Sequence, residues 1–180
     1  MSNLKELTWE HHQNAERQEF VKELMTGISD ERYAQYLYNQ FPIYELLEAL
    51  GSLHGLFDDM PELKRAQRIK EDYLELWPHK DRTPTVCPVV EEYVQHLKPL
   101  MNDPDKLMAH IYVRHMGDLS GGQIIAKRVP GSGKFYGFDR DIDDLKKVVR
   151  EKINDEMAEE AKVCFDFAAR LFQELMEHQP

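Results

Sequence analysis

Apolar residues recur every three or four positions along most of the chain, which is the spacing of helices that bury one face. Glycine and proline interrupt this spacing and leave six segments of helical length, at about 3–26, 30–50, 62–76, 87–101, 105–128 and 139–177. Ser29 and Asp103 stand where helix N-caps are expected, and Gly27 stands where a C-cap is expected. Runs of alternating β-branched residues are missing, so the pattern predicts an all-α bundle with no strand.

The length of 180 residues suits one core, and we predict a single domain over 1–180. Hydrophobic residues make up 42% of the chain and charged residues 31%, as in ordinary soluble globular proteins. We find no apolar run of the ~20 residues that a membrane span needs, and we expect neither an apolar leader nor a membrane tail. Cys87 and Cys164 lie far apart and are interpreted as free thiols, so we expect a soluble, cytoplasmic protein.

The formal net charge of −10 argues against nucleic acid as a partner. The segment 127–152 differs from the rest, because it holds eight basic residues against five acidic ones. This local excess of positive charge has two interpretations. It is either a solvated helix surface or a surface that meets an acidic partner.

The predicted helix 105–128 contains three glycines. Each glycine in a helix interior costs about 1 kcal/mol relative to alanine, so three of them need a reason. At about 100° per residue they form a bare stripe, with Asp118 projecting between them and Arg114 beside them. A stripe without side chains lets a flat ligand lie against the backbone, whereas close packing of two helices is the alternative.

The middle of this segment has the string Tyr112-x-Arg114-x-x-Gly117-Asp118-Leu119-Ser120-Gly121-Gly122-Gln123. It resembles the distal-helix signature of the haem oxygenase family. Other family-like positions cover nearly the whole chain, among them Glu16, Phe20, Tyr44, the Arg65…Asp72…Trp77 helix and the Phe165…Phe172 helix. The resemblance implies a bundle that holds haem between the first helix and the glycine-kinked distal helix, with haem contacts from Gly117, Ser120, Gly121, Gly122 and Phe165.

Eight histidines compete as the ligand of the haem iron. Periodicity places His11 on the apolar seam of the first helix and would bury it in the core, whereas His12 shares a stripe with polar residues. The resemblance selects His12, which stands directly before the xxAE pattern that ends at Glu16, and His11 is the alternative. Glu16 would then accept a hydrogen bond from the other ring nitrogen and fix the orientation of the imidazole.

The resemblance also implies that the two haem propionates are held by Lys5, Tyr112, Lys146 and Arg150. The pair Lys146 and Arg150 is spaced i, i+4 on one helix face, as two carboxylates would require. Because such a clamp sets the rotation of the haem in its pocket, the resemblance implies attack at the α-meso carbon.

By the same resemblance haem is both cofactor and substrate, and O₂ with a reductant converts it to biliverdin, carbon monoxide and ferrous iron. Asp118 would deliver protons through ordered water, and Arg114 and Tyr44 would support that network. The expected electron donor is ferredoxin or a flavin reductase that meets the basic segment 127–152. A downstream bilin reductase is a further expected partner, whereas nucleic acid and a membrane anchor are not expected.

Three other functions suit the residues less well. A protein that only binds or stores haem needs no acid in a glycine stripe, so Asp118 argues against it. A di-iron carboxylate bundle needs two Glu-x-x-His pairs, and the chain contains none. A structural adaptor leaves the three glycines unexplained.

Overall fold

A computed structural model describes residues 2–180 and consists of helices joined by loops. The α-helices are α1 (Leu4–Leu7), α2 (Trp9–Glu16), α3 (Glu19–Thr26), α4 (Asp30–Leu53), α5 (Ala66–Leu76), α6 (Pro88–Leu97), α7 (Pro104–Leu119), α8 (Gly121–Ile125), α9 (Ile142–Arg150) and α10 (Ala158–Glu177). Short 3₁₀ turns lie between them, at η1 (Pro61–Leu63), η2 (Lys98–Asn102), η3 (Lys134–Tyr136) and η4 (Asp155–Met157). Residues 2–180 contain no strand, which confirms the all-α prediction.

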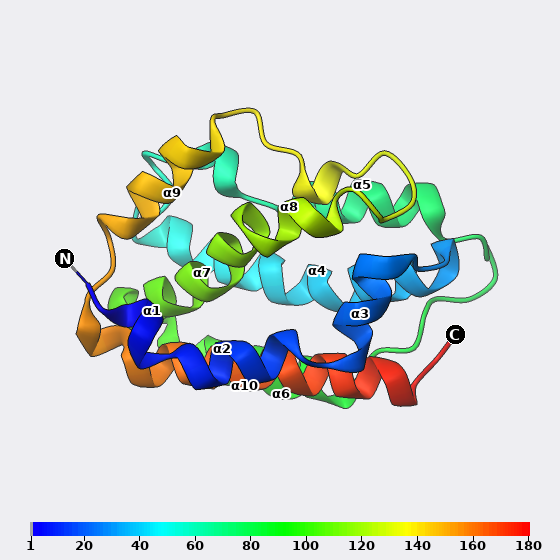
Figure 1. Ribbon diagram of the computed structural model, residues 1–180, viewed down its shortest axis with the longest axis horizontal. Helices are drawn as coiled ribbons and strands as arrows, with labels where there is room; N and C mark the ends of the chain where they lie inside the picture. The colour runs from blue at the N-terminus through cyan, green and yellow to red at the C-terminus, as the bar shows by residue number, and fades with distance from the viewer. Residues whose placement is uncertain (1) are drawn as a thin grey trace.

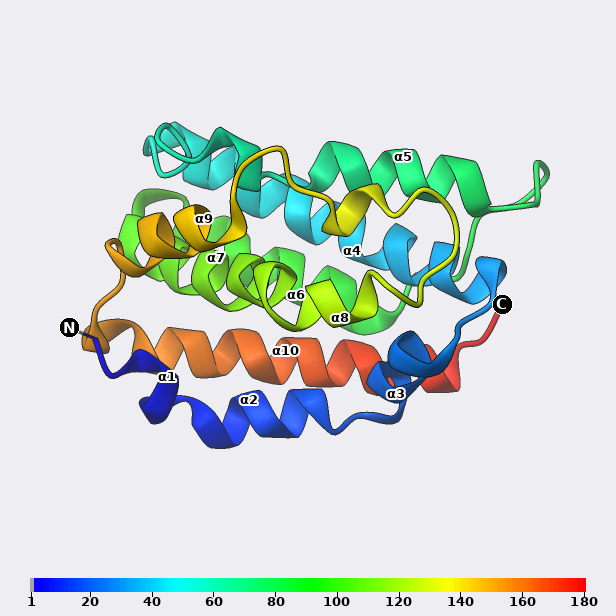
Figure 2. The same ribbon diagram turned by 45° about the horizontal axis from the view of Figure 1, so that its top comes forward.

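The long helices α4, α7 and α10 set the arrangement of the others (Figure 1). Helix α4 packs against α5, α6 and α7, and α10 packs against α2, α3, α6 and α7. In Figure 2 α4 and α5 lie at the top, α7 in the middle, and α10 and α2 at the bottom. The apolar faces that the spacing predicts meet between these layers, where the buried side chains include Leu37, Leu47, Leu107 and Leu171.

The predicted helix caps are confirmed. The Ser29 hydroxyl accepts a hydrogen bond from the backbone N–H of Arg32 at 3.3 Å, and the Asp103 carboxylate accepts one from Lys106 at 3.1 Å. Gly27 ends α3 with a φ of +127°, a backbone conformation that side chains with a Cβ rarely adopt. Local side-chain chemistry therefore fixes these three helix ends.

The predicted helix 3–26 is wrong as a continuous element, because it is divided into α1, α2 and α3. The Thr8 hydroxyl donates to the carbonyl of Leu4 at 2.8 Å where α1 ends, and Gln18 is extended between α2 and α3. The predicted helix 139–177 is likewise divided into α9 and α10. Apolar spacing continues through these breaks, which is why it did not reveal them.

A buried carboxylate ties α4 to α5 and α7. Oε2 of Glu48 accepts hydrogen bonds from the backbone N–H of Arg65 at 2.6 Å and from Nε2 of His115 at 2.8 Å, and Oε1 accepts one from the N–H of Ala66 at 3.0 Å. The Arg65 side chain is fully buried and donates from Nη1 to the carbonyl of Phe135 at 2.8 Å. This network holds the start of α5 and the loop before α9 against the face of α4 that meets α7.

Candidate functional site

The predicted helix 105–128 is interrupted at Ser120, where α7 gives way to α8. Ser120 has φ −108° and ψ −94°, which lies outside the helical region. Gly117 therefore lies in the last turn of α7, whereas Gly121 and Gly122 begin α8. The prediction of three glycines inside one helix is wrong, and the cost of an interior glycine applies to Gly117 alone.

Two of these glycines leave a bare patch. A Cβ atom built on Gly117 or Gly121 would meet no heavy atom within 4 Å among the residues that the structure describes. Gly117 is exposed and Gly121 is half-buried. The missing side chains therefore create room beside the helix, as a flat ligand would require.

Gly122 is explained differently. A Cβ atom there would lie 2.7 Å from the ring of Tyr136, whose hydroxyl lies 3.0 Å from the hydroxyl of Tyr36 on α4. Close packing, which was the alternative explanation for the stripe, accounts for this glycine. Its hydrogen atom lets the aromatic ring approach the start of α8.

Asp118 lies at the end of α7 and is only 6% exposed. The hydroxyl of Tyr44 on α4 donates to its carboxylate, with the phenol oxygen 2.8 Å from Oδ2 and 3.1 Å from Oδ1. Burial raises the pKa of Asp118 from 3.8 to about 7, and the hydrogen bond from Tyr44 and the nearby positive groups offset only part of that effect. Burial likewise raises the pKa of Tyr44, so the phenol keeps its proton. The site therefore holds a carboxyl group that gains and loses a proton near neutral pH.

Arg114 lies one turn before Asp118 and is also buried. Its Nη1 donates to Oε1 of Gln40 at 2.9 Å and its Nε donates to the Tyr93 hydroxyl at 3.2 Å. The guanidinium carbon lies 4.8 Å from the ring centroid of Tyr93 and 5.6 Å from that of Tyr44. Nη2 is buried and has no hydrogen-bond partner within the described part of the chain.

Sequence reasoning missed two residues that position Arg114. Gln40 precedes Tyr44 by four residues on α4, so helical spacing alone places both on one face. Tyr93 lies on α6 and comes close to Arg114 only through tertiary packing. The first residue could have been found from the sequence, and the second could not.

His12 on α2 is half-buried, with 31% of its side chain exposed. Its Nε2 lies 2.7 Å from Oε1 of Glu16, which confirms the predicted pairing of these two residues. The imidazole stacks on the ring of Phe165 from α10 at a centroid distance of 5.0 Å, and the Trp9 ring meets it edge-on at a centroid distance of 5.4 Å. The hydrogen bond to Glu16 occupies Nε2 of His12, and the second ring nitrogen, Nδ1, can act as a metal ligand.

His11 is not buried in the core, contrary to what periodicity indicates. Its Nδ1 lies 2.8 Å from Oδ1 of Asp166 on α10, and 36% of its side chain is exposed. Each of the two histidines thus has a carboxylate partner, which is Asp166 for His11 and Glu16 for His12. Only His12, however, stacks on an aromatic ring that belongs to the predicted haem contacts.

The four residues expected to hold the propionates lie toward one end of the molecule. Helices α1 and α9, which carry Lys5, Lys146 and Arg150, lie at the left in Figures 1 and 2, and α9 packs against α7. Burial raises the pKa of Tyr112 on α7, and the positive charge of nearby Arg150 opposes that rise. Lys5 is exposed, with its Nζ 5.9 Å from the ring centroid of Trp9.

Comparison with known proteins shows which family the chain belongs to. The family model described as heme oxygenase matches residues 1–174. The chain belongs to the heme oxygenase family. Members of this family are oxidoreductases that degrade haem.

Relatives of known sequence and structure agree with that assignment. Heme oxygenase-1 from Synechocystis sp. PCC6803 in complex with heme superimposes with a TM-score of 0.81 at 26% identity, covering 97% of this chain and 90% of that one. Heme oxygenase from Guillardia theta is 31% identical over 203 residues, which cover 96% of this chain and 84% of the relative. Heme oxygenase 2 from Macaca fascicularis is 29% identical, and the match spans 96% of this chain but 64% of that relative's length.

The residues of this heme oxygenase fit a haem group. Gly117 and Gly121 provide a surface on which no side chain stands, and His12 offers an imidazole that Glu16 orients and Phe165 supports. In residues 2–180 no helix is both long and apolar enough to cross a membrane.

The raised pKa of Asp118 makes the stability of the haem-free protein depend on pH. Because the folded state holds this proton up to about pH 7 and the unfolded state releases it near 4, the contribution to stability is complete below pH 4 and is lost as pH rises through 7. We expect the free energy of unfolding of wild type to fall by about 3 kcal/mol between pH 5 and pH 8 relative to Asp118→Asn. Urea unfolding of both proteins at four pH values measures this difference, and Asp105→Asn, an exposed acid on the same helix, is the control. A difference between wild type and Asp118→Asn that does not change with pH would show that the carboxyl is not protonated in the folded state.

Proposed function

We propose that this chain opens the haem ring oxidatively, at the α-meso carbon, and produces biliverdin, carbon monoxide and ferrous iron from haem, O₂ and reductant. The observation that carries the proposal is a buried carboxyl with a pKa of about 7, at Asp118, next to a bare glycine surface at Gly117. A haem-storage protein needs the surface but not the acid. Bound haem would supply the iron that activates O₂ as well as the ring that is opened.

His12 would hold the iron on the other side of the haem. Glu16 accepts a hydrogen bond from one imidazole nitrogen, which fixes the tautomer and makes the remaining nitrogen a better ligand. The stack on Phe165 restricts rotation of the ring. His12 is therefore oriented before the haem arrives, which lowers the entropy lost on binding.

Asp118 would supply protons to the reaction. Its carboxyl is half protonated near pH 7, so it both donates and regains a proton at ordinary pH. The Tyr44 hydroxyl donates to the carboxylate form, and Arg114 contributes a positive charge held in place by Gln40 and Tyr93. Water bound between Asp118 and the bare glycines would carry the proton.

The regiochemistry would follow from how the propionates are held. Lys5, Lys146 and Arg150 offer positive charge from α1 and α9, and Tyr112 offers a hydroxyl from α7. Charge-assisted hydrogen bonds to two carboxylates would select one rotation of the haem in its plane. Ser120 and Gly121 would border the haem at the break between α7 and α8, and Gly122 would act there through its backbone.

The function is tested by mixing the purified chain with hemin, ascorbate and air. We expect the Soret band to disappear as biliverdin absorption grows. Asp118→Asn should still bind one haem per chain but form biliverdin about 100-fold more slowly, because a positioned acid contributes that order of rate. Asp105→Asn is the matched control on α7. Failure of the wild type to form biliverdin refutes the function, whereas a normal rate in Asp118→Asn refutes only the role of Asp118.

The iron ligand is tested by resonance Raman spectroscopy of the ferrous haem complex. We expect His12→Ala to lose the iron–histidine stretching band and to regain it when imidazole is added. His11→Ala should keep the band, because His11 pairs with Asp166. An unchanged band in His12→Ala shows that another residue holds the iron.

The electron donor is proposed to be ferredoxin, with a flavin reductase as the alternative. The basic excess of segment 127–152 supports an acidic partner, although part of it is neutralised within the chain. Lys152 pairs with Asp59 at 2.9 Å, and Arg140 pairs with Asp144 at 2.7 Å. Lys147 is exposed on α9 beside the residues that would hold the propionates, so it is the better probe of docking.

Lys147→Glu should raise the KM for ferredoxin several-fold while haem affinity and ascorbate-driven turnover stay unchanged. The reason is that steering between surface charges acts over a Debye length of ~8 Å and is screened by salt. Lys80→Glu, in the loop after α5 at the other end of the molecule, is the control (Figure 1). Equal KM values for the two variants would mean that α9 is not the docking surface.

We further propose a cytoplasmic location and a bilin reductase that consumes the product. Cys87 and Cys164 are both buried as free thiols, which supports a reducing compartment. Biliverdin is a chemically stable product, and a reductase is the class of enzyme that acts on its conjugated bridges.

A further inference from the structure

A cluster of two histidines and one glutamate lies where three helices meet, apart from the proposed haem contacts. His96 belongs to α6, His110 to α7 and Glu160 to α10. Their three ligand atoms, two Nε2 and one carboxylate oxygen, all lie within 4.8 Å of one another. His110 precedes Gly117 by seven residues, so it lies about 10 Å from Gly117 toward the N-terminal end of α7. We propose that His96, His110 and Glu160 form a binding site for a divalent transition metal ion, Zn²⁺ being the ion that the ligand set favours.

The donor atoms and their separations suit zinc. Two imidazole nitrogens and one carboxylate oxygen are the set found in zinc sites that keep a fourth position for water. Oε1 of Glu160 lies 2.6 Å from Nε2 of His96 and 2.7 Å from Nε2 of His110. Ligand atoms of a tetrahedral zinc ion are about 3.3 Å apart. The Glu160 oxygen must therefore move away from each histidine nitrogen by less than 1 Å. His96 is 31% exposed at its side chain and can make that adjustment by rotation.

The surroundings orient the buried ligand. His110 is fully buried, and its Nδ1 lies 2.6 Å from the Tyr93 hydroxyl. A metal-bound histidine places its other N–H on an acceptor of this kind, which fixes the tautomer. The Tyr93 oxygen is itself positioned by Nε of Arg114 at 3.2 Å and by Sγ of Cys164 at 3.1 Å. His110 is therefore held in an orientation that presents Nε2 to Glu160.

The carboxylate of Glu160 lies beside a hollow at the surface. A hollow beside Glu160 is lined mainly by acidic side chains, namely Asp103, Asp105, Glu156 and Glu159, together with Lys106, Asn154 and Met157. The excess of carboxylates would attract a cation to the entrance.

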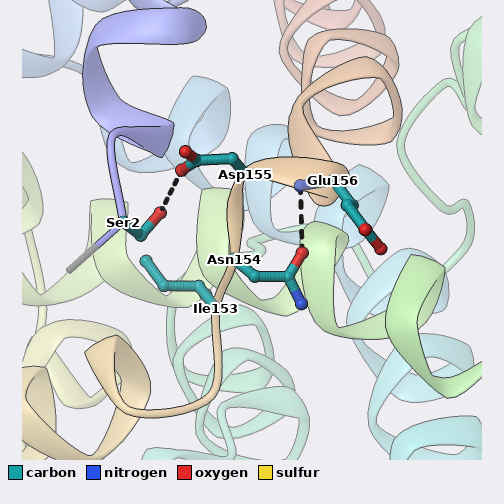
Figure 3. A pocket seen from close by; sticks show the side chains of 5 residues that line it. All are labelled: Ser2, Ile153, Asn154, Asp155 and Glu156. Atoms are coloured by element: carbon teal, nitrogen blue, oxygen red, sulfur yellow. Dashed lines mark hydrogen bonds between the residues drawn. The ribbon is translucent and has the colours of Figure 1, made fainter.

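The turn η4 contributes Glu156 and Met157 to the lining of this hollow. Figure 3 shows a neighbouring hollow, lined by Ser2, Ile153, Asn154, Asp155 and Glu156, in which Asp155 accepts a hydrogen bond from the Ser2 hydroxyl and Asn154 accepts one from the backbone N–H of Glu156. These contacts fasten the start of α10 to the N-terminal segment. The turn on one side of the hollow beside Glu160 is thus tied to the N-terminal segment.

The site is tested with the untagged, haem-free chain by competition for Zn²⁺ against a chromophoric chelator at pH 7.5. We expect one ion per chain with a Kd in the micromolar range or below, and an affinity that falls as pH falls because protonated imidazoles cannot bind metal. His96→Ala and Glu160→Gln should each weaken binding by about 100-fold or more. Co²⁺ should give the intense visible absorption of a tetrahedral complex in wild type and lose it in both variants.

Two controls separate this site from other histidines. His54→Ala removes a histidine whose Nε2 contacts the carbonyl of Met101, and His12→Ala removes the proposed iron ligand. Neither should change the affinity for Zn²⁺ or the cobalt spectrum. Absence of binding at millimolar Zn²⁺, or equal binding by wild type and His96→Ala, overturns the proposal and leaves a hydrogen-bonded His–Glu–His cluster that only joins three helices.

Discussion

The buried carboxylate of Glu48 is the constraint on which the position of the haem-facing helix depends. Its two oxygens accept from three donors, so both are hydrogen-bonded inside the protein. One of these donors is His115, which stands three residues before Asp118 on α7. The rotation of α7 about its axis is thereby fixed against α4. Once that rotation is set, Asp118 must lie against Tyr44 and Gly117 must lie at the surface.

The contrast between Glu48 and Asp118 explains why one carboxylate is structural and the other is suited to proton transfer. Within residues 2–180, Tyr44 is the only residue that donates a hydrogen bond to the carboxylate of Asp118. The effect of burial on the pKa of Asp118 outweighs the effect of that bond. An under-compensated carboxylate in the interior is costly when charged, so it takes up a proton near neutral pH. The number of hydrogen-bond donors that reach each carboxylate therefore separates the structural role of Glu48 from the proton-transfer role proposed for Asp118.

The sequence predicted features that depend on neighbouring residues along a helix, and it missed those that depend on contacts between helices. The caps at Ser29 and Asp103 and the pair His12–Glu16 follow from spacings of three and four residues, and the structure confirms them. The spacing did not predict the break at Ser120, because apolar and small residues continue through it, whereas the family resemblance implied a glycine kink in this helix. Gly117 borders open space, whereas Gly122 packs against Tyr136. Tyr136 lies fourteen residues after Gly122, so spacing along the helix could not distinguish the two glycines.

The Tyr93 hydroxyl joins the proposed metal site to the proposed proton-delivery site, because it has one proton and three neighbours. When Nε2 of His110 carries a proton and donates it to Glu160, neutral His110 presents a bare Nδ1 that accepts the proton of Tyr93. When Nε2 holds a metal ion, Nδ1 carries the hydrogen and donates to the Tyr93 oxygen, whose own proton then turns to Cys164. In both cases Nε of Arg114 donates to the same oxygen. The Tyr93 oxygen therefore links the histidine of the proposed metal site to Arg114 beside Tyr44 through a single shared atom.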